Sequence, residues 1–178
     1  MIIREATVND AGGIARVHVD TWRTTYRGIV PDDYLGGLSY AQRQATWERG
    51  LGQQQRRQCV YVAEDGAGQI LGFASGGPER SGDPVYDGEL YAIYILQPWQ
   101  GHGIGRQLAM RVVQWLIDHG YVSMLVWVLA RNPSRRVYEV LGGEYVRTQT
   151  IEIGGVQLDE VAYGWRDLRA AIREWSGE

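Results

Sequence analysis

The stretch "LYAIYILQPWQGHGIGRQLAMRVVQWL", residues 90–116, holds three kinds of local sequence in a row. It begins as a run of apolar and aromatic residues, which favours a buried strand over 88–96. It continues with glycines at positions 101, 103 and 105, and then places apolar residues at helical spacing from about 103 to 119. A strand that enters a helix through alternating glycines brings its backbone amides close to a ligand or to a neighbouring element.

The glycine loop does not match the common nucleotide-binding patterns. A P-loop needs a Lys-Ser or Lys-Thr pair after its glycines, and a dinucleotide fingerprint needs a further glycine at 106 or 108. Arg106 and Leu108 stand there instead. Two readings remain: a helix N-terminus that receives an anionic group, for which glycine leaves room, or a tight strand-to-helix turn without a ligand.

Periodicity and turn residues predict the elements on either side of this stretch. Helices are expected over 7–22, 31–37, 39–50, 134–141 and 167–175, and strands over 2–6, 58–65, 69–77, 121–129 and on both sides of residues 154–155. Residues 53–57 are interpreted as a polar connector. Because the helix over 103–119 joins two strands, these strands should be parallel. The order predicts a single α/β domain over 1–178, with a mixed, twisted sheet and helices on both faces.

The composition narrows the functional class. The net charge is −3 and the pI is about 5.7, which argues against nucleic acid as a partner. Cys59 is the only cysteine, so a disulfide framework is excluded, and no stretch has the length of a membrane span. The three histidines stand apart, without a second ligand at metal spacing, so no metal is expected. We expect a soluble cytoplasmic protein without a membrane partner.

The loop "QGHGIG" resembles the Q/R-x-x-G-x-G/A loop of the GNAT superfamily of acetyl-CoA-dependent N-acetyltransferases. The preceding "ELYAIYIL", the Asn132 after the next strand, "VYEVLGG" and "VAYGW" also have counterparts there, so the resemblance covers nearly the whole chain. It implies a mostly antiparallel sheet of about six to seven strands. "TWRTTYRGIVPDDYL" resembles a bacterial branch of the family, which names no substrate.

The resemblance implies a binding site for acetyl-CoA. The positions that match the pyrophosphate-binding loop are Gln100, Gly101, His102, Gly103, Ile104 and Gly105. Arg106 is either a further contact or a solvated residue of the first helical turn. The pantetheine arm is expected to pair with backbone groups of Ile93, Tyr94 and Ile95, beside a bulge near 91–93 that is common in the family. Asn132 matches a cofactor-contacting asparagine, although its gap to Tyr138 is one residue shorter than in some branches.

Acetyl transfer to an amine needs a group that removes a proton and a group that returns one to the departing thiolate. Glu89 lies eleven residues before Gln100, the offset of the general base in related histone acetyltransferases. Strand alternation places it with Tyr91, Ile93 and Ile95 on one face. Glu89 is thus either the base, directly or through water, or a solvated rim residue. Tyr138 matches the position of the general acid; the alternative is a tyrosine that packs in the core.

Aromatic residues are expected around the acceptor amine, since the first helix and the last strands face it in many relatives. The candidates are Trp22, Tyr26, Tyr91 and Tyr163. The predicted activity is direct acetyl transfer to a primary amine of a small molecule or a peptide. The alternatives are a non-catalytic coenzyme-A-binding sensor and a protein N-terminal or lysine acetyltransferase. A homodimer is compatible with the resemblance, because pairing through terminal strands is common in the family.

Overall fold

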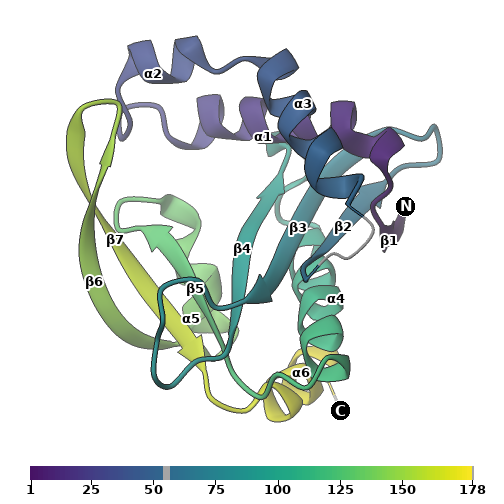
Figure 1. Cartoon of the computed structure of the whole chain (residues 1–178), viewed down its shortest axis with the longest axis vertical. Helices are drawn as coiled ribbons and strands as arrows, with labels where there is room; N and C mark the ends of the chain where they lie inside the picture. The colour runs from purple at the N-terminus through teal and green to yellow at the C-terminus, as the bar shows by residue number, and fades with distance from the viewer. Residues whose placement is uncertain (54–56, 178) are drawn as a thin grey trace.

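The computed structural model describes residues 1–53 and 57–177, and its centre is one seven-stranded sheet (Figure 1). The strands are β1 (Ile2–Glu5), β2 (Cys59–Glu64), β3 (Ile70–Pro78), β4 (Gly88–Ile95), β5 (Met124–Leu129), β6 (Glu144–Ile153) and β7 (Val156–Trp165), in the order β1-β2-β3-β4-β5-β7-β6. Only β4 and β5 pair in parallel; the other neighbours are antiparallel. The predicted mixed, mostly antiparallel sheet is confirmed. Residues 54–56 of the expected connector lie outside the described residues.

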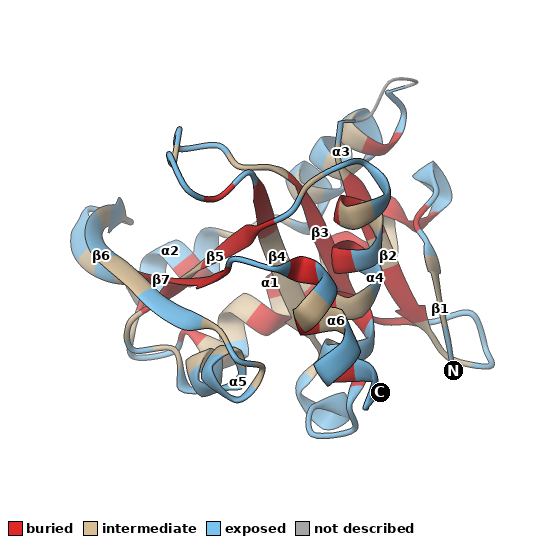
Figure 2. Cartoon of the chain, turned by 90° about the horizontal axis from the view of Figure 1, so that it is seen from below, coloured by how far each residue is buried: buried red, intermediate tan, exposed pale blue. Residues whose placement is uncertain are grey.

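Helices cover both faces of the sheet (Figures 1 and 2). They are α1 (Ala11–Thr25), α2 (Asp32–Gly37), α3 (Tyr40–Leu51), α4 (Ile104–Asp118), α5 (Arg136–Val140) and α6 (Leu168–Ser176). Alternate residues of each strand divide the core in two, because successive side chains point to opposite faces. Val60 and Val62 pack with α1 and α3, whereas Cys59 and Ala63 pack with α4 and α6.

Strand β4 carries a bulge at Tyr91. Ser75 of β3 pairs with Ala92 and the next residue, Gly76, pairs with Leu90, so Tyr91 has no opposite residue. The parallel ladder to β5 covers only residues 88–90 of β4. Beyond it the two strands splay apart, as the bulge expected near 91–93 predicts. The backbone of β4 after the bulge therefore faces β5 without strand pairing.

The bulge corrects one prediction from strand alternation. Simple alternation would place Glu89 on the same face as Ile93 and Ile95, but the extra residue reverses the order beyond it. Ile93 and Ile95 pack against the α4 side of the sheet, whereas Tyr94 packs on the α1 side. Glu89 consequently shares a cavity with Tyr94.

Candidate active site

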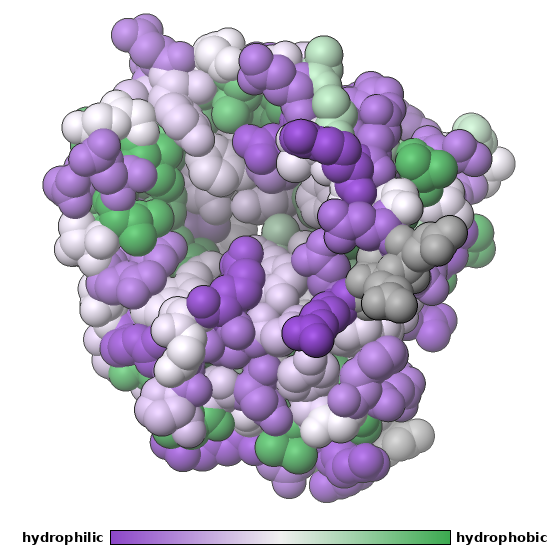
Figure 3. All heavy atoms as spheres, in the orientation of Figure 1, coloured by the Kyte–Doolittle hydropathy of each residue, from purple (hydrophilic) through white to green (hydrophobic). Residues whose placement is uncertain are grey.

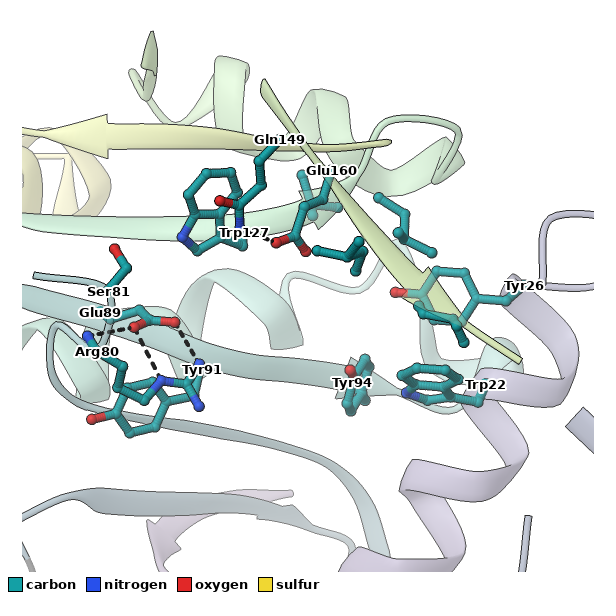
Figure 4. Close-up of a pocket in the computed structure, with 14 residues that line it drawn as sticks. Trp22, Tyr26, Arg80, Ser81, Glu89, Tyr91, Tyr94, Trp127, Gln149 and Glu160 are labelled. Carbon is teal, nitrogen blue, oxygen red and sulfur yellow. Dashed lines mark hydrogen bonds and ion pairs between the residues drawn. The ribbon is translucent and has the colours of Figure 1, made fainter. Parts of the chain in front are cut away.

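A cavity of about 420 Å³ lies where β4 separates from β5. The space-filling view shows this face hollowed near its centre (Figure 3). Figure 4 shows the cavity from inside, with side chains from the end of α1, the loop before β4, and strands β4 to β7. Its lining consists of Trp22, Tyr26, Arg80, Ser81, Glu89, Tyr91, Tyr94, Trp127, Val128, Leu129, Gln149, Ile151, Ile153 and Glu160.

Glu89 is buried at the β4 wall of this cavity and is held by Arg80 (Figure 4). One carboxylate oxygen accepts the backbone N–H and the Nε–H of Arg80, both at 3.1 Å, and the other accepts Nη2–H at 2.5 Å. With only 3% of the residue exposed, Glu89 is not a solvated rim residue. The ion pair raises the pKa of the Arg80 guanidinium. A carboxylate has about four acceptor positions, so three hydrogen bonds leave one for a further donor.

Tyr91 supports this ion pair from below. Its ring lies 4.0 Å from the guanidinium carbon of Arg80, and its hydroxyl donates to the carbonyl of Pro78 at 2.6 Å. Burial raises the pKa of Tyr91 to about 12, so the phenol is neutral at physiological pH. Stacking on an aromatic face and two parallel hydrogen bonds hold the arginine in one orientation. The structure thus fixes the position of the Glu89 carboxylate.

Three phenols from distant parts of the chain meet at the splay. Burial raises the pKa of Tyr26, and the neighbouring Tyr94 and Tyr138 contribute electrostatically. Tyr26 closes the end of α1, Tyr94 belongs to β4 and Tyr138 to α5. Asn132 joins this group, because its side-chain amide donates to the Tyr26 hydroxyl at 3.2 Å. Its oxygen accepts from the backbone N–H of Ser134 at 2.8 Å, which caps the turn before α5.

Tyr138 is half-buried between the splay and the core. Its ring centroid lies 6.1 Å from that of Tyr163 and 6.5 Å from that of Trp165. Burial raises the pKa of the Tyr138 hydroxyl, so the group keeps its proton at neutral pH. Among the described residues, the hydroxyl has no hydrogen-bond partner. The structure thus gives Tyr138 a packing role and leaves its hydroxyl free for a ligand.

Tyr163 is not brought to the cavity. Its ring packs in the core cluster with α4 and α6, on the opposite face of β7, and its hydroxyl donates to Glu139 at 2.6 Å. In contrast, Trp22, Tyr26 and Tyr91 all line the cavity. The sequence predicts the strand of Tyr163 but not the face that its side chain takes, because alternation does not tell which of the two sets of β7 residues faces the cavity.

The glycines of the loop before α4 have two different roles. Gly101 and Gly103 adopt left-handed φ angles of 79° and 76°, and a Cβ atom at either position would meet nothing within 4 Å. Gly105 instead allows close packing, since its Cβ would lie 3.1 Å from the Ile95 side chain. The turn therefore needs glycine at 101 and 103 for its conformation, and both positions border open space.

The first turn of α4 offers free backbone donors to an anion. Gly103 is the residue before the helix, and no side chain caps the turn that begins at Ile104. The first N–H groups of a helix lack internal partners and carry partial positive charge. Gln100 and His102 are engaged locally: the Gln100 amide donates to the Ile95 carbonyl at 3.0 Å, and the His102 ring lies 2.9 Å from the Gln100 carbonyl. Arg106 stands in the first turn, and its side chain has no hydrogen bond or ion pair with any described residue.

Some site residues escape prediction from the sequence. Arg80 lies in a polar loop, and its partner becomes apparent only when the loop folds over β4. Trp127 of β5 and Glu160 of β7 also line the cavity. Their position there depends on pairing between strands that are distant in the sequence. The sequence does contain one indication for Glu160, because its carboxylate interrupts the otherwise apolar side of a predicted strand.

Residues 1–53 and 57–177 contain no group of three side chains that could hold a metal ion. No helix in the same part of the chain has the length and apolar character needed to cross a membrane.

The fold agrees with comparisons to known proteins. The sequence profile of the Acetyltransferase (GNAT) family matches residues 19–142. The uncharacterised N-acetyltransferase YuaI of Bacillus subtilis is 47% identical over 169 residues, which cover 94% of both chains. The ribosomal-protein-alanine N-acetyltransferase of Brucella melitensis superposes with a TM-score of 0.71 at 24% identity, over 93% of this chain and 99% of that one. PaiA N-acetyltransferase of Thermoplasma acidophilum, solved with coenzyme A, gives a TM-score of 0.69 at 15% identity, over 92% and 98%.

These matches show that the protein is an acyltransferase enzyme. The chain belongs to the Acetyltransferase (GNAT) family.

Proposed function

We propose that this protein transfers the acetyl group of acetyl-CoA to the primary amine of a small cationic molecule. The observation that carries the proposal is the splay between β4 and β5. It leaves one edge of residues 93–95 without a strand partner, on the strand that contributes Glu89 and Tyr94 to the cavity and that leads into the uncapped start of α4. The enzyme class follows from the family; the donor, the acceptor and the residue roles are our proposals.

The residues around the splay fit acetyl-CoA. The backbone amides of Gly101 to Gly105, with those of Gln100 and Arg106 beside them, would hold the pyrophosphate, because the left-handed glycines leave room there. Ile93, Tyr94 and Ile95 pair with β3 only, which leaves their other edge for the pantetheine arm. Asn132 would face the same arm from the start of the next turn. Bound acetyl-CoA supplies an activated acetyl group as a thioester.

Glu89 would act as the general base. An alkylamine is nearly all ammonium at neutral pH and must lose a proton before its nitrogen can attack a carbonyl. Arg80 occupies three acceptor positions of Glu89, and the remaining one suits a water molecule that carries the proton from the amine. The C–N bond then forms as the C–S bond breaks, and the Tyr138 hydroxyl returns a proton to the departing sulfur.

Direct transfer is favoured over an acyl-enzyme. Cys59 is buried and lies outside the cavity, and burial raises the pKa of its thiol to about 12. A thiol of that pKa is not a nucleophile at neutral pH. The size of the cavity, about 420 Å³, is that of a small-molecule site, which supports a small acceptor over a protein chain.

The test is release of free thiol from acetyl-CoA in the presence of single amines: alkylamines, diamines, amino acids, aminoglycosides and short peptides. We expect release with at least one small amine, and about a 100-fold lower turnover in Glu89→Gln. Glu174→Gln, an exposed carboxylate on α6, is the matched control and should turn over normally. If acetyl-CoA binds but no amine of the panel causes release of free thiol, a coenzyme-A sensor would be favoured instead.

A further inference from the structure

The cavity contains a second glutamate on the wall that faces Glu89. Glu160 comes from β7, between Leu129 of β5 and Gln149 of β6 in the strand register (Figure 4). It is half-buried, and its neighbours in the lining are the apolar side chains of Leu129 and Ile151 and the ring of Trp127. A carboxylate on such a surface requires compensation, because burial penalises the charged form.

The two glutamates differ in how their charges are balanced. Glu89 is neutralised by Arg80, the only cation among the described residues that line the cavity. Glu160 accepts a hydrogen bond of 2.6 Å from the side-chain amide of Gln149, which carries no charge. Arg147 lies near Trp127, 5.1 Å from the ring centroid, but it is paired with Asp83. Among the described residues, no cation pairs with Glu160, so the lining carries one uncompensated negative charge.

The aromatic lining suits the same kind of ligand. The rings of Trp22, Tyr26, Tyr94 and Trp127 border the cavity, and ring faces attract ammonium groups. Glu160 lies close enough to Tyr26 that its charge contributes to the raised pKa of that phenol. An alkyl chain along the aromatic rings and an ammonium at Glu160 would satisfy both features.

A ligand ammonium paired with Glu160 would not be the nitrogen that reacts. A nitrogen held as ammonium by an unbalanced carboxylate has no lone pair with which to attack a carbonyl. The reacting nitrogen belongs instead near Glu89, where the carboxylate is already paired with Arg80 and can pass a proton through its remaining acceptor position. Two carboxylates on opposite walls thus divide the tasks of reaction and recognition.

We propose that Glu160 is a specificity-determining residue that binds a second ammonium group of the acceptor, so that the preferred substrates are short linear diamines. The inference rests on the proposed function, because it uses the same cavity as the acceptor site. One nitrogen is acetylated beside Glu89, and the other stays protonated against Glu160.

The experiment compares 1,5-diaminopentane with pentylamine, which has the same chain and one charge fewer. We expect the KM for the diamine to be about tenfold lower, with similar kcat, which corresponds to about 1.4 kcal/mol. Glu160→Gln should raise the KM for the diamine to that for pentylamine without changing kcat. The control is Glu152→Gln, because Glu152 pairs with Gln157 across the same two strands and does not line the cavity.

Calorimetric titration of both amines into the coenzyme-A-bound protein separates this inference from the proposed function. Diamine binding that Glu160→Gln weakens about tenfold, without turnover, would support the role of Glu160 and count against acetyl transfer. Turnover of pentylamine and 1,5-diaminopentane with equal KM would support acetyl transfer and overturn the role of Glu160. The inference is equally overturned if Glu160→Gln leaves both the KM ratio and the diamine affinity unchanged, or if neither amine binds.

Discussion

At the scale of single residues, the site depends on which polar groups are already satisfied. Glu89 is buried and held by three N–H donors, so its chemistry is limited to one remaining acceptor position. The Tyr138 hydroxyl has no partner among the described residues, although its ring is packed. The proposed proton transfers require a carboxylate in a fixed position, which is Glu89, and a phenol that is free to donate its proton, which is Tyr138.

Replacing Tyr138 by phenylalanine should lower kcat by at least about tenfold and leave acetyl-CoA affinity nearly unchanged. The ring keeps its contacts with Tyr163 and Trp165, so only the hydroxyl is lost. The check is steady-state kinetics beside calorimetric affinity. Tyr145→Phe is the control, since Tyr145 is 61% exposed on β6. An unchanged kcat in Tyr138→Phe would remove the acid role.

His18 should make the stability of the protein depend on pH. It is half-buried, with its ring beside Trp22, Phe73 and Tyr94, and burial lowers its pKa from 6.5 to about 3. Below pH 6.5 the unfolded chain takes up a proton that the folded chain does not, so the free energy of unfolding falls as the pH falls. Between pH 6.5 and 4.5, the contribution of His18 lowers the free energy of unfolding by about 2 kcal/mol.

Denaturant titrations of His18→Phe test this at both pH values. The variant keeps a ring in the same place and should lose the pH-dependent part of the free energy of unfolding that His18 contributes. His119→Gln, at an exposed position at the end of α4, should retain it. Equal pH dependence in the wild type and in His18→Phe would show that His18 does not titrate as described.

At the scale of elements, the local signals in β4 and α4 were sufficient to predict both elements and the parallel crossover between them. Each signal lies within one segment: an apolar run, glycines, and helical spacing up to Gly120. These local signals could not predict on which side of the sheet each β4 side chain lies. The bulge at Tyr91 depends on the register with β3, and one extra residue moves all later side chains to the other face.

The two ends of α4 provide a matched pair of glycines. Gly103 and Gly120 have φ angles of 76° and 88°, and neither has an atom within 4 Å of an added Cβ. Alanine at either position should cost about 1–2 kcal/mol of stability, from the strained left-handed conformation. Only Gly103→Ala should also weaken acetyl-CoA binding, by about tenfold, because its methyl group enters the space before the helix.

Thermal unfolding and calorimetric titration measure the two effects separately. If Gly103→Ala and Gly120→Ala lower the melting temperature similarly but bind acetyl-CoA with equal affinity, the start of α4 is not the pyrophosphate site.

At the scale of the whole molecule, the site is assembled from segments that only the sheet brings together. The sequence and its resemblance to the family indicated Glu89, Tyr138, Trp22 and Tyr26, and all but Tyr138 line the cavity. Arg80 and Glu160 were not predicted, because their roles arise from a loop that crosses β4 and from the order β5-β7-β6. Tyr163 shows the same limit, since its strand was predicted but not its face.

The central claim is that the splay and the start of α4 together bind acetyl-CoA, and thermal unfolding with millimolar acetyl-CoA tests it most directly. A ligand that binds only the folded state stabilises it by about 2.7 kcal/mol at a hundred times its Kd. For a chain of this size that corresponds to a rise in Tm of roughly 5–10 °C. We predict a rise of this size in the wild type and a smaller one in Gly103→Ala; an unchanged Tm in the wild type would contradict the account.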